Sequence, residues 1–120
     1  MLQPFELQML TFLQLALISH QKGQWQGRNR FLLLGGIAAT RAGIPEVAAQ
    51  CRELVLLQAP KHLIGQHPTI GDALKHPDFQ PFLLSLERFC SFEEAEFLPP
   101  METEEDPERA AEKLLLAMSG

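Results

Sequence analysis

Aromatic and strand-forming residues are scarce in this chain of 120 residues. It has no tyrosine, one tryptophan and little valine, whereas leucine and alanine are frequent. Because β-branched and aromatic side chains favour strands and leucine and alanine favour helices, the composition predicts an all-α protein. An apolar content of 46% is typical of a folded domain, and a chain of this length holds one such core.

Cysteine is almost absent as well. The two cysteines, Cys51 and Cys90, are too few for a disulfide framework, and each falls in an apolar stretch. A free cysteine in such a stretch behaves as a small apolar residue, so we expect both to be buried thiols. This cysteine usage indicates a reducing, cytoplasmic setting.

The sequence contains no convincing targeting or membrane-spanning segment. No lysine or arginine precedes the apolar residues 9–18, whereas a signal peptide begins with basic residues. The apolar residues 31–39 are far fewer than the roughly 20 that cross a bilayer. We therefore expect no membrane partner.

Negative charge is concentrated at one end of the chain. Residues 1–92 carry eight Lys or Arg and six Asp or Glu, whereas residues 93–120 carry two and nine, respectively. The formal net charge is -5. An acidic chain is poorly suited to bind a phosphate backbone, so we expect no nucleic-acid partner.

Helical periodicity and helix-ending residues define the expected elements. Helices are predicted over residues 4–21, from Gly23 or Gly27 to 42, and over 45–58, 69–75, 78–89 and 107–118, with a loop at 61–68. Thr69, Asp78 and Asp106 are the expected N-caps of the last three. Ser91 and Glu94 form a capping box that predicts a short helix ending before Pro99.

The expected fold is an irregular antiparallel bundle of five or six helices. The first three helices should form its core. We expect a helical domain over residues 1–98, an acidic linker over 99–106 and a C-terminal amphipathic helix over 107–120. A lone helix of that length is marginal in water. It must therefore dock on its own chain, on a second copy or in a partner's groove.

Gly35 and Gly36 interrupt the most apolar segment of the chain. Each glycine costs a helix about 1 kcal/mol relative to alanine. The close approach of a neighbouring helix would compensate for this cost. A break in the helix at the glycine pair is the alternative.

Small residues and a proline recur at helix-contact positions between residues 29 and 62. The matching positions are Leu32, Gly36, Ala39, Gly43, Ala48 and Pro60. In these positions the segment resembles the helical hairpin of tetratricopeptide repeats. It departs from that pattern at Arg52, where the family has a bulky aromatic residue, and no second repeat follows in register. The resemblance implies a TPR-like centre of the bundle and a scaffold that holds partner peptides or helices in a groove.

Three histidines are the main candidates for chemistry. His62, His67 and His76 lie in or beside expected loops, where we expect them to face solvent, and Asp72 and Asp78 are near them in sequence. Three histidines and a carboxylate could bind zinc, but their spacing fits no standard site. No nucleophile or phosphate-binding motif is present. We therefore expect no catalytic residue, metal or cofactor, with a small metal-binding or enzymatic domain as an alternative.

Two groups of residues are candidates for binding a partner. The first lies around the expected connection between the first two helices. The second forms the apolar stripe of the terminal helix. The candidates are Lys22, Trp25, Arg28 and Arg30, and then Leu114, Leu115 and Met118. These groups predict a non-catalytic protein-interaction or scaffolding module with a protein partner or self-association. The remaining alternative is a structural subunit of a homo-oligomer.

Overall fold

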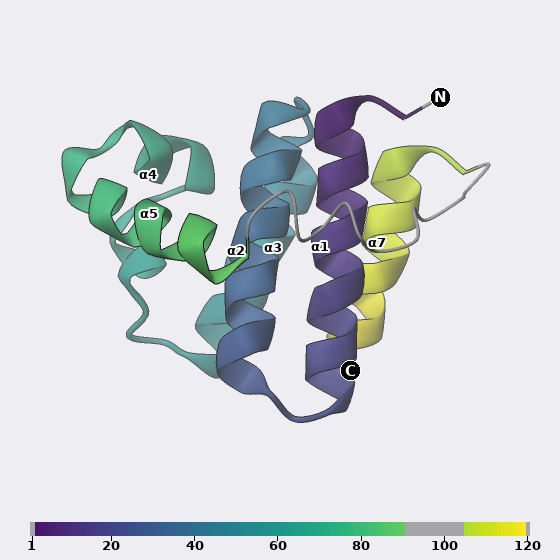
Figure 1. The fold of residues 1–120 in the computed structure, drawn as a ribbon, viewed down its shortest axis with the longest axis horizontal. Coiled ribbons are helices and arrows are strands. Elements are labelled where there is room, and N and C mark those ends of the chain that lie inside the picture. The colour runs from purple at the N-terminus through teal and green to yellow at the C-terminus, as the bar shows by residue number, and fades with distance from the viewer. Residues whose placement is uncertain (1, 91–104, 120) are drawn as a thin grey trace.

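The computed structural model describes residues 2–90 and 105–119. Within these residues the chain forms helices and no strand, which confirms the predicted all-α class. The elements are α1 (Pro4–Gln21), α2 (Trp25–Arg41), α3 (Pro45–Gln58), the 3-10 helix η1 (Leu63–Gln66), α4 (Ile70–Lys75), the 3-10 helix η2 (Pro77–Phe79), α5 (Gln80–Phe89) and α7 (Pro107–Met118) (Figure 1).

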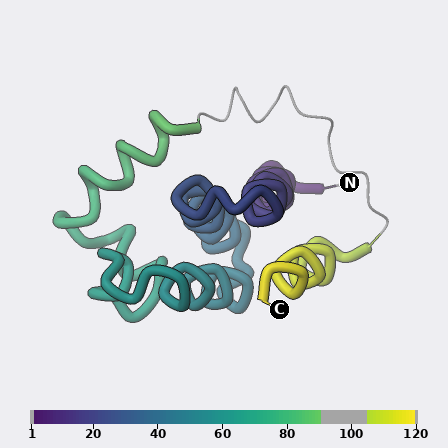
Figure 2. Tube along the Cα trace, turned by 90° about the horizontal axis from the view of Figure 1, so that it is seen from below, coloured from purple at the N-terminus to yellow at the C-terminus, as the bar shows by residue number. Residues whose placement is uncertain are grey.

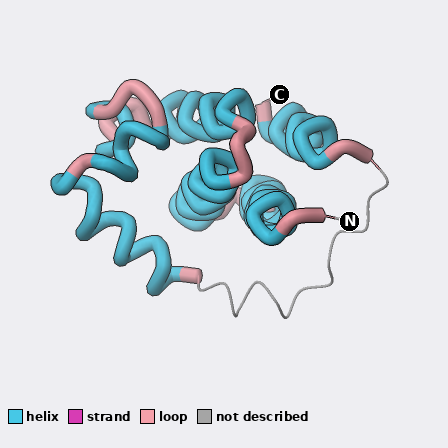
Figure 3. The backbone as a smooth tube through the Cα atoms, turned by 90° about the horizontal axis from the view of Figure 1, so that it is seen from above, coloured by secondary structure: helices cyan, strands magenta, loops and turns pink. Residues whose placement is uncertain are grey.

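The first three helices form consecutive antiparallel hairpins. Gly23 and Gly43 end α1 and α2 with φ angles of 69° and 78°, a conformation that glycine adopts without steric cost. Seen along the helices, α1 and α2 lie side by side, and α3 and α7 lie together on one side of that pair (Figures 2 and 3). Helices α4 and α5 lie on the side of α2 that is remote from α7 (Figure 1).

Helix α2 runs through the centre of the bundle without a break. All of its residues from Leu32 to Ala39 are buried. A Cβ atom added at Gly35 would lie 2.9 Å from Leu13 Cδ2 of α1. One added at Gly36 would lie 3.2 Å from Cys51 Cβ of α3 and would collide with Ile70 of α4. The glycine pair therefore admits neighbouring helices on two sides, whereas the sequence predicted the close approach of one.

Helix α7 docks on its own chain. Pro107 occupies its first turn, and the Asp106 side chain accepts a hydrogen bond from Arg109 N, as expected of the N-cap. The stripe of Ala111, Leu115 and Met118 is buried, and the helix contacts α1 and α3. The capping-box helix predicted from Ser91 and most of the acidic linker lie outside the described residues.

The region between α3 and α5 departs from the prediction in two details. The expected loop at 61–68 contains η1. Asp78 does not cap α5, because the Asp78 backbone N–H donates to His76 Nδ1 at 3.2 Å, and this bond starts η2 one turn earlier. Thr69 caps α4 as predicted, accepting a hydrogen bond from Asp72 N at 3.0 Å.

The cysteines lie in the core as predicted. Cys51 and Cys90 are both buried. Burial raises the pKa of the Cys51 thiol to about 12, so that this group stays protonated and a poor nucleophile at neutral pH. Within the described ranges, no helix has both the length and the apolar character needed to cross a bilayer.

Gly36→Leu should destabilise the protein. The added side chain must displace Ile70 and press on Cys51, and overpacking of this kind costs about 1–3 kcal/mol. Gly27→Ala is the matched control, because its Cβ would meet only Ser19 Oγ at an ordinary 3.7 Å and should raise stability by about 0.5 kcal/mol. Urea unfolding of the two variants checks this. A Gly36→Leu variant as stable as the wild type would contradict the close packing at α2.

The unfolding free energy should fall as the pH drops below about 6.5. Desolvation by burial lowers the pKa of His62 from its ordinary 6.5, and His62 Nδ1 accepts a hydrogen bond from Ile64 N that protonation would remove. Between the folded and unfolded pKa values, protons bind preferentially to the unfolded chain, so stability is lost as the pH falls through that interval.

The test is urea unfolding between about pH 5 and 7.5, the range in which histidine titrates. His62→Gln should reduce the slope of stability against pH. An identical slope in the variant and the wild type would show that His62 makes no such contribution.

Candidate functional site

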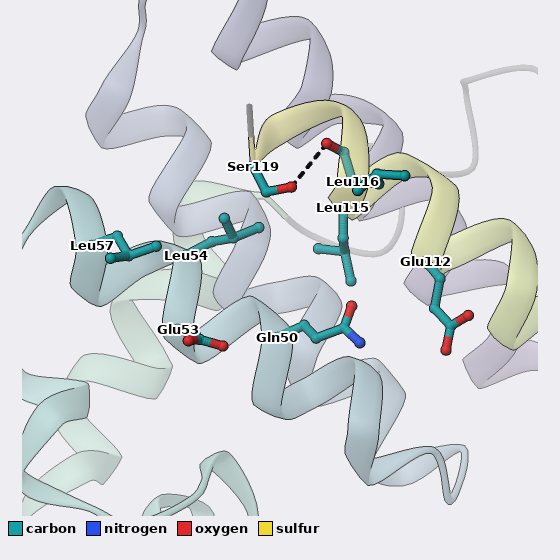
Figure 4. A pocket seen from close by; sticks show the side chains of 8 residues that line it. All are labelled: Gln50, Glu53, Leu54, Leu57, Glu112, Leu115, Leu116 and Ser119. Carbon is teal, nitrogen blue, oxygen red and sulfur yellow. Dashed lines mark hydrogen bonds between the residues drawn. The ribbon is translucent and has the colours of Figure 1, made fainter.

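A groove lies between α3 and α7 on the described surface. It has a volume of about 570 Å³. One wall consists of α3 side chains, Gln50, Glu53, Leu54 and Leu57, and the other of α7 side chains, Glu112, Leu115, Leu116 and Ser119 (Figure 4). The groove lies beside the contact between α3 and α7, where side chains of both helices remain uncovered.

A second hollow continues the groove toward the start of α2. It has a volume of about 260 Å³ and adds Trp25, Arg28, Gln58 and Met118 to its lining. The two hollows share three residues, Leu54, Leu57 and Ser119. They therefore adjoin and form one site, which we call the α3–α7 groove.

Large apolar side chains remain exposed along this groove. Leu57 and Leu116 are each 73% exposed, and Trp25 is 44% exposed. The other exposed large apolar side chains of the described residues, Phe5, Ile18 and Leu84, do not line it. Single exposed leucines are ordinary, but apolar side chains gathered in a groove with a polar rim are typical of an interaction site.

Arg28 lies at the Trp25 end of the groove and is only 4% exposed. Its Nη1 donates to Asn29 Oδ1 at 2.9 Å, and Asn29 Nδ2 donates to Gln58 Oε1 at 2.6 Å. The guanidinium carbon is 5.6 Å from the centre of the Trp25 ring. Among the described residues Nε has no hydrogen-bond partner, and no carboxylate forms an ion pair with Arg28.

Burial lowers the pKa of Arg28. The pKa of arginine is so high that the side chain nevertheless stays charged at neutral pH. A buried charge without an ionic partner is costly, and proteins normally pair it. The structure therefore leaves a buried, cationic donor at one end of an apolar groove.

The structure brings together four of the seven residues proposed from the sequence. Trp25, Arg28, Leu115 and Met118 line the groove. Arg28 is buried rather than exposed, because the start of α2 packs inward against α3 through the hydrogen bond between Asn29 and Gln58.

The other three residues lie apart from the groove lining. Lys22 is exposed at the end of α1, and Leu114 is half-buried. Arg30 is exposed, with its guanidinium carbon 4.8 Å from the centre of the Phe89 ring, and thus reaches toward α5. The α3 wall was missed. The residue that could have revealed this wall in the sequence was Leu57. It is an apolar residue one turn beyond Leu54, on a helix whose buried face other apolar residues already form.

The three histidines do not form a metal centre in the described part of the chain. The rings of His67 and His76 are 5.0 Å apart, but the His62 ring packs on Phe82 instead. No group of three or more potential ligand residues is arranged to hold a metal ion there. His67 is 7% exposed rather than solvent-facing, because its ring also packs edge-on against the buried Phe79.

Comparison with known proteins adds no family assignment. No protein-family model matches the sequence, and no characterised protein or solved structure matches it significantly. The function must therefore be inferred from the groove and the residues that line it.

Proposed function

We propose that this protein is a non-catalytic protein-interaction module that holds a partner segment in the α3–α7 groove. The observation that carries the proposal is the exposure of Leu57 and Leu116 on opposite walls of one groove. Full burial of a leucine side chain contributes about 1.5–3 kcal/mol. Two such residues, with Trp25 beside them, provide the apolar centre that partner recognition requires.

The shape of the groove favours a protein segment over a small molecule. Binding pockets for small molecules enclose most of the ligand surface. Here the leucines on both walls remain largely open to solvent, and the carboxylates of Glu53 and Glu112 stand at the rim. An amphipathic helix could cover the leucines with its apolar face while its polar face remained in water.

The sequence resemblance supports the same proposal. Residues 29–62, which resemble a tetratricopeptide-type hairpin, include most of α2 and all of α3. Repeats of that kind hold partner segments in a groove between helices. In the proposed module α3 supplies one wall of the groove, and α7 supplies the other.

The test replaces both exposed leucines. The double variant Leu57→Asp, Leu116→Asp should keep the fold, because both side chains already face water, and should lose its partner. Leu84→Asp is the matched control, since Leu84 is 54% exposed on α5, away from the groove. Quantitative affinity capture from native extract should recover the same protein with the wild type and with the control, and not with the double variant.

The same experiment can contradict the proposal. Helical circular dichroism of each variant first establishes that the fold is intact. If a correctly folded double variant captures the same proteins as the wild type, the α3–α7 groove is not the interaction surface.

A further inference from the structure

We infer that the occupant of the α3–α7 groove is an amphipathic helix of a partner protein that places a carboxylate against Arg28. This inference deepens the proposed function and rests on it. It identifies the chemistry by which the partner is recognised: apolar side chains over Leu57 and Leu116, and an acidic side chain at the Trp25 end.

The first argument is the unsatisfied state of Arg28. Its side chain lines the groove, is 4% exposed and leaves the Nε donor without a partner among the described residues. A carboxylate is the group that best matches a guanidinium, because it accepts two parallel N–H bonds. Nη1 is already used by Asn29, and the buried Nε has no partner among the described residues, so a carboxylate would approach the part of the guanidinium that lines the groove. A bound carboxylate would thus provide the missing ionic partner.

The second argument is the distribution of charge along the groove. Glu53 and Glu112 lie toward the end of the groove marked by Gln50 (Figure 4). Arg28 lines the adjoining hollow at the opposite end, together with Gln58 and Ser119. A helix carries partial positive charge at its N-terminus and partial negative charge at its C-terminus. The partner helix should therefore point its C-terminal end toward Arg28 and carry lysine or arginine near Glu53 and Glu112.

The length of the groove fits a short helical contact. Residues 50–57 of α3 and 112–119 of α7 each extend over about 10 Å, which corresponds to roughly two helical turns. Apolar residues at i, i+3 or i+4 of the partner would cover both leucines, and the acidic residue would follow about one turn later.

A second copy of this chain fits the groove less well. A second copy could fill the groove with a helix only by releasing that helix from its own bundle. Each helix of the described residues already packs within its own fold. None of them is therefore available to insert into a neighbour's groove.

The experiment selects binders from a display library of short, conformationally constrained helical peptides, with the full chain as the target. Peptides that bind the wild type and Leu84→Asp, but not the Leu57→Asp, Leu116→Asp variant, are groove binders. We expect these peptides to share an aspartate or glutamate at one fixed position, C-terminal to their apolar residues. Trp25, the single tryptophan of the chain, should report binding through a change in its fluorescence.

A paired substitution locates the carboxylate. Changing the shared acid of a selected peptide to its amide should weaken binding about tenfold or more, as expected for a charge-assisted hydrogen bond. Arg28→Gln should weaken binding of the acidic peptide by the same factor and leave binding of the amide peptide unchanged. Arg30→Gln is the matched control, because Arg30 is an exposed arginine on the same helix and does not line the groove.

The outcomes separate this inference from the proposed function. Groove binders without a fixed acidic residue, or with equal affinity as acid and amide, would overturn the Arg28 pairing and leave the groove as the interaction site. A library that yields no groove binders would count against both. A solution mass that doubles in the wild type and returns to that of a monomer in the double leucine variant would assign the groove to a second copy. If Arg28→Gln fails to fold, the acid-to-amide change in the peptide still decides the question.

Discussion

The close approach of helices at Gly35 and Gly36 is the constraint on which the rest of the bundle depends. These glycines let α1 approach α2 through Leu13, and let α3 and α4 approach it through Cys51 and Ile70. Dense packing of this kind has little tolerance for an added methyl group, so it fixes the neighbours of α2 in position. With α1 and α3 held by α2, their outer sides provide the surface on which α7 docks.

The docking of α7 creates the groove. Ala111, Leu115 and Met118 of α7 are buried against the bundle, but α7 leaves part of α3 uncovered. Leu57 and Leu116 are left facing water on either side of the line where the two helices meet. The same geometry places Arg28 at the end of that line without a carboxylate partner from the described residues. One packing arrangement thus produces both the apolar and the ionic features of the proposed site.

The helical architecture follows from local sequence signals, whereas the groove does not. Gly23, Gly43 and Pro45 mark where helices end and begin, and Asp106 caps α7 as its position predicts. The groove depends on which sides of α3 and α7 meet, and no periodicity within a single helix reveals that. In the sequence, Leu57 was only one apolar residue more than the buried face of α3 needs. The burial of Arg28 results from the packing of α2 against α3, which the sequence of α2 alone does not reveal.

Hydrogen exchange of the α7 amides in the free protein tests most directly whether this groove exists before a partner binds. A helix of twelve residues that does not dock is marginal in water, and its amides would exchange almost as fast as those of an unfolded chain. If α7 is docked as described, the amides of Leu115 and Met118 should be protected to within about tenfold of core amides in α1 such as that of Leu13. Exchange of the α7 amides at the unfolded rate, with α1 still protected, would contradict the account.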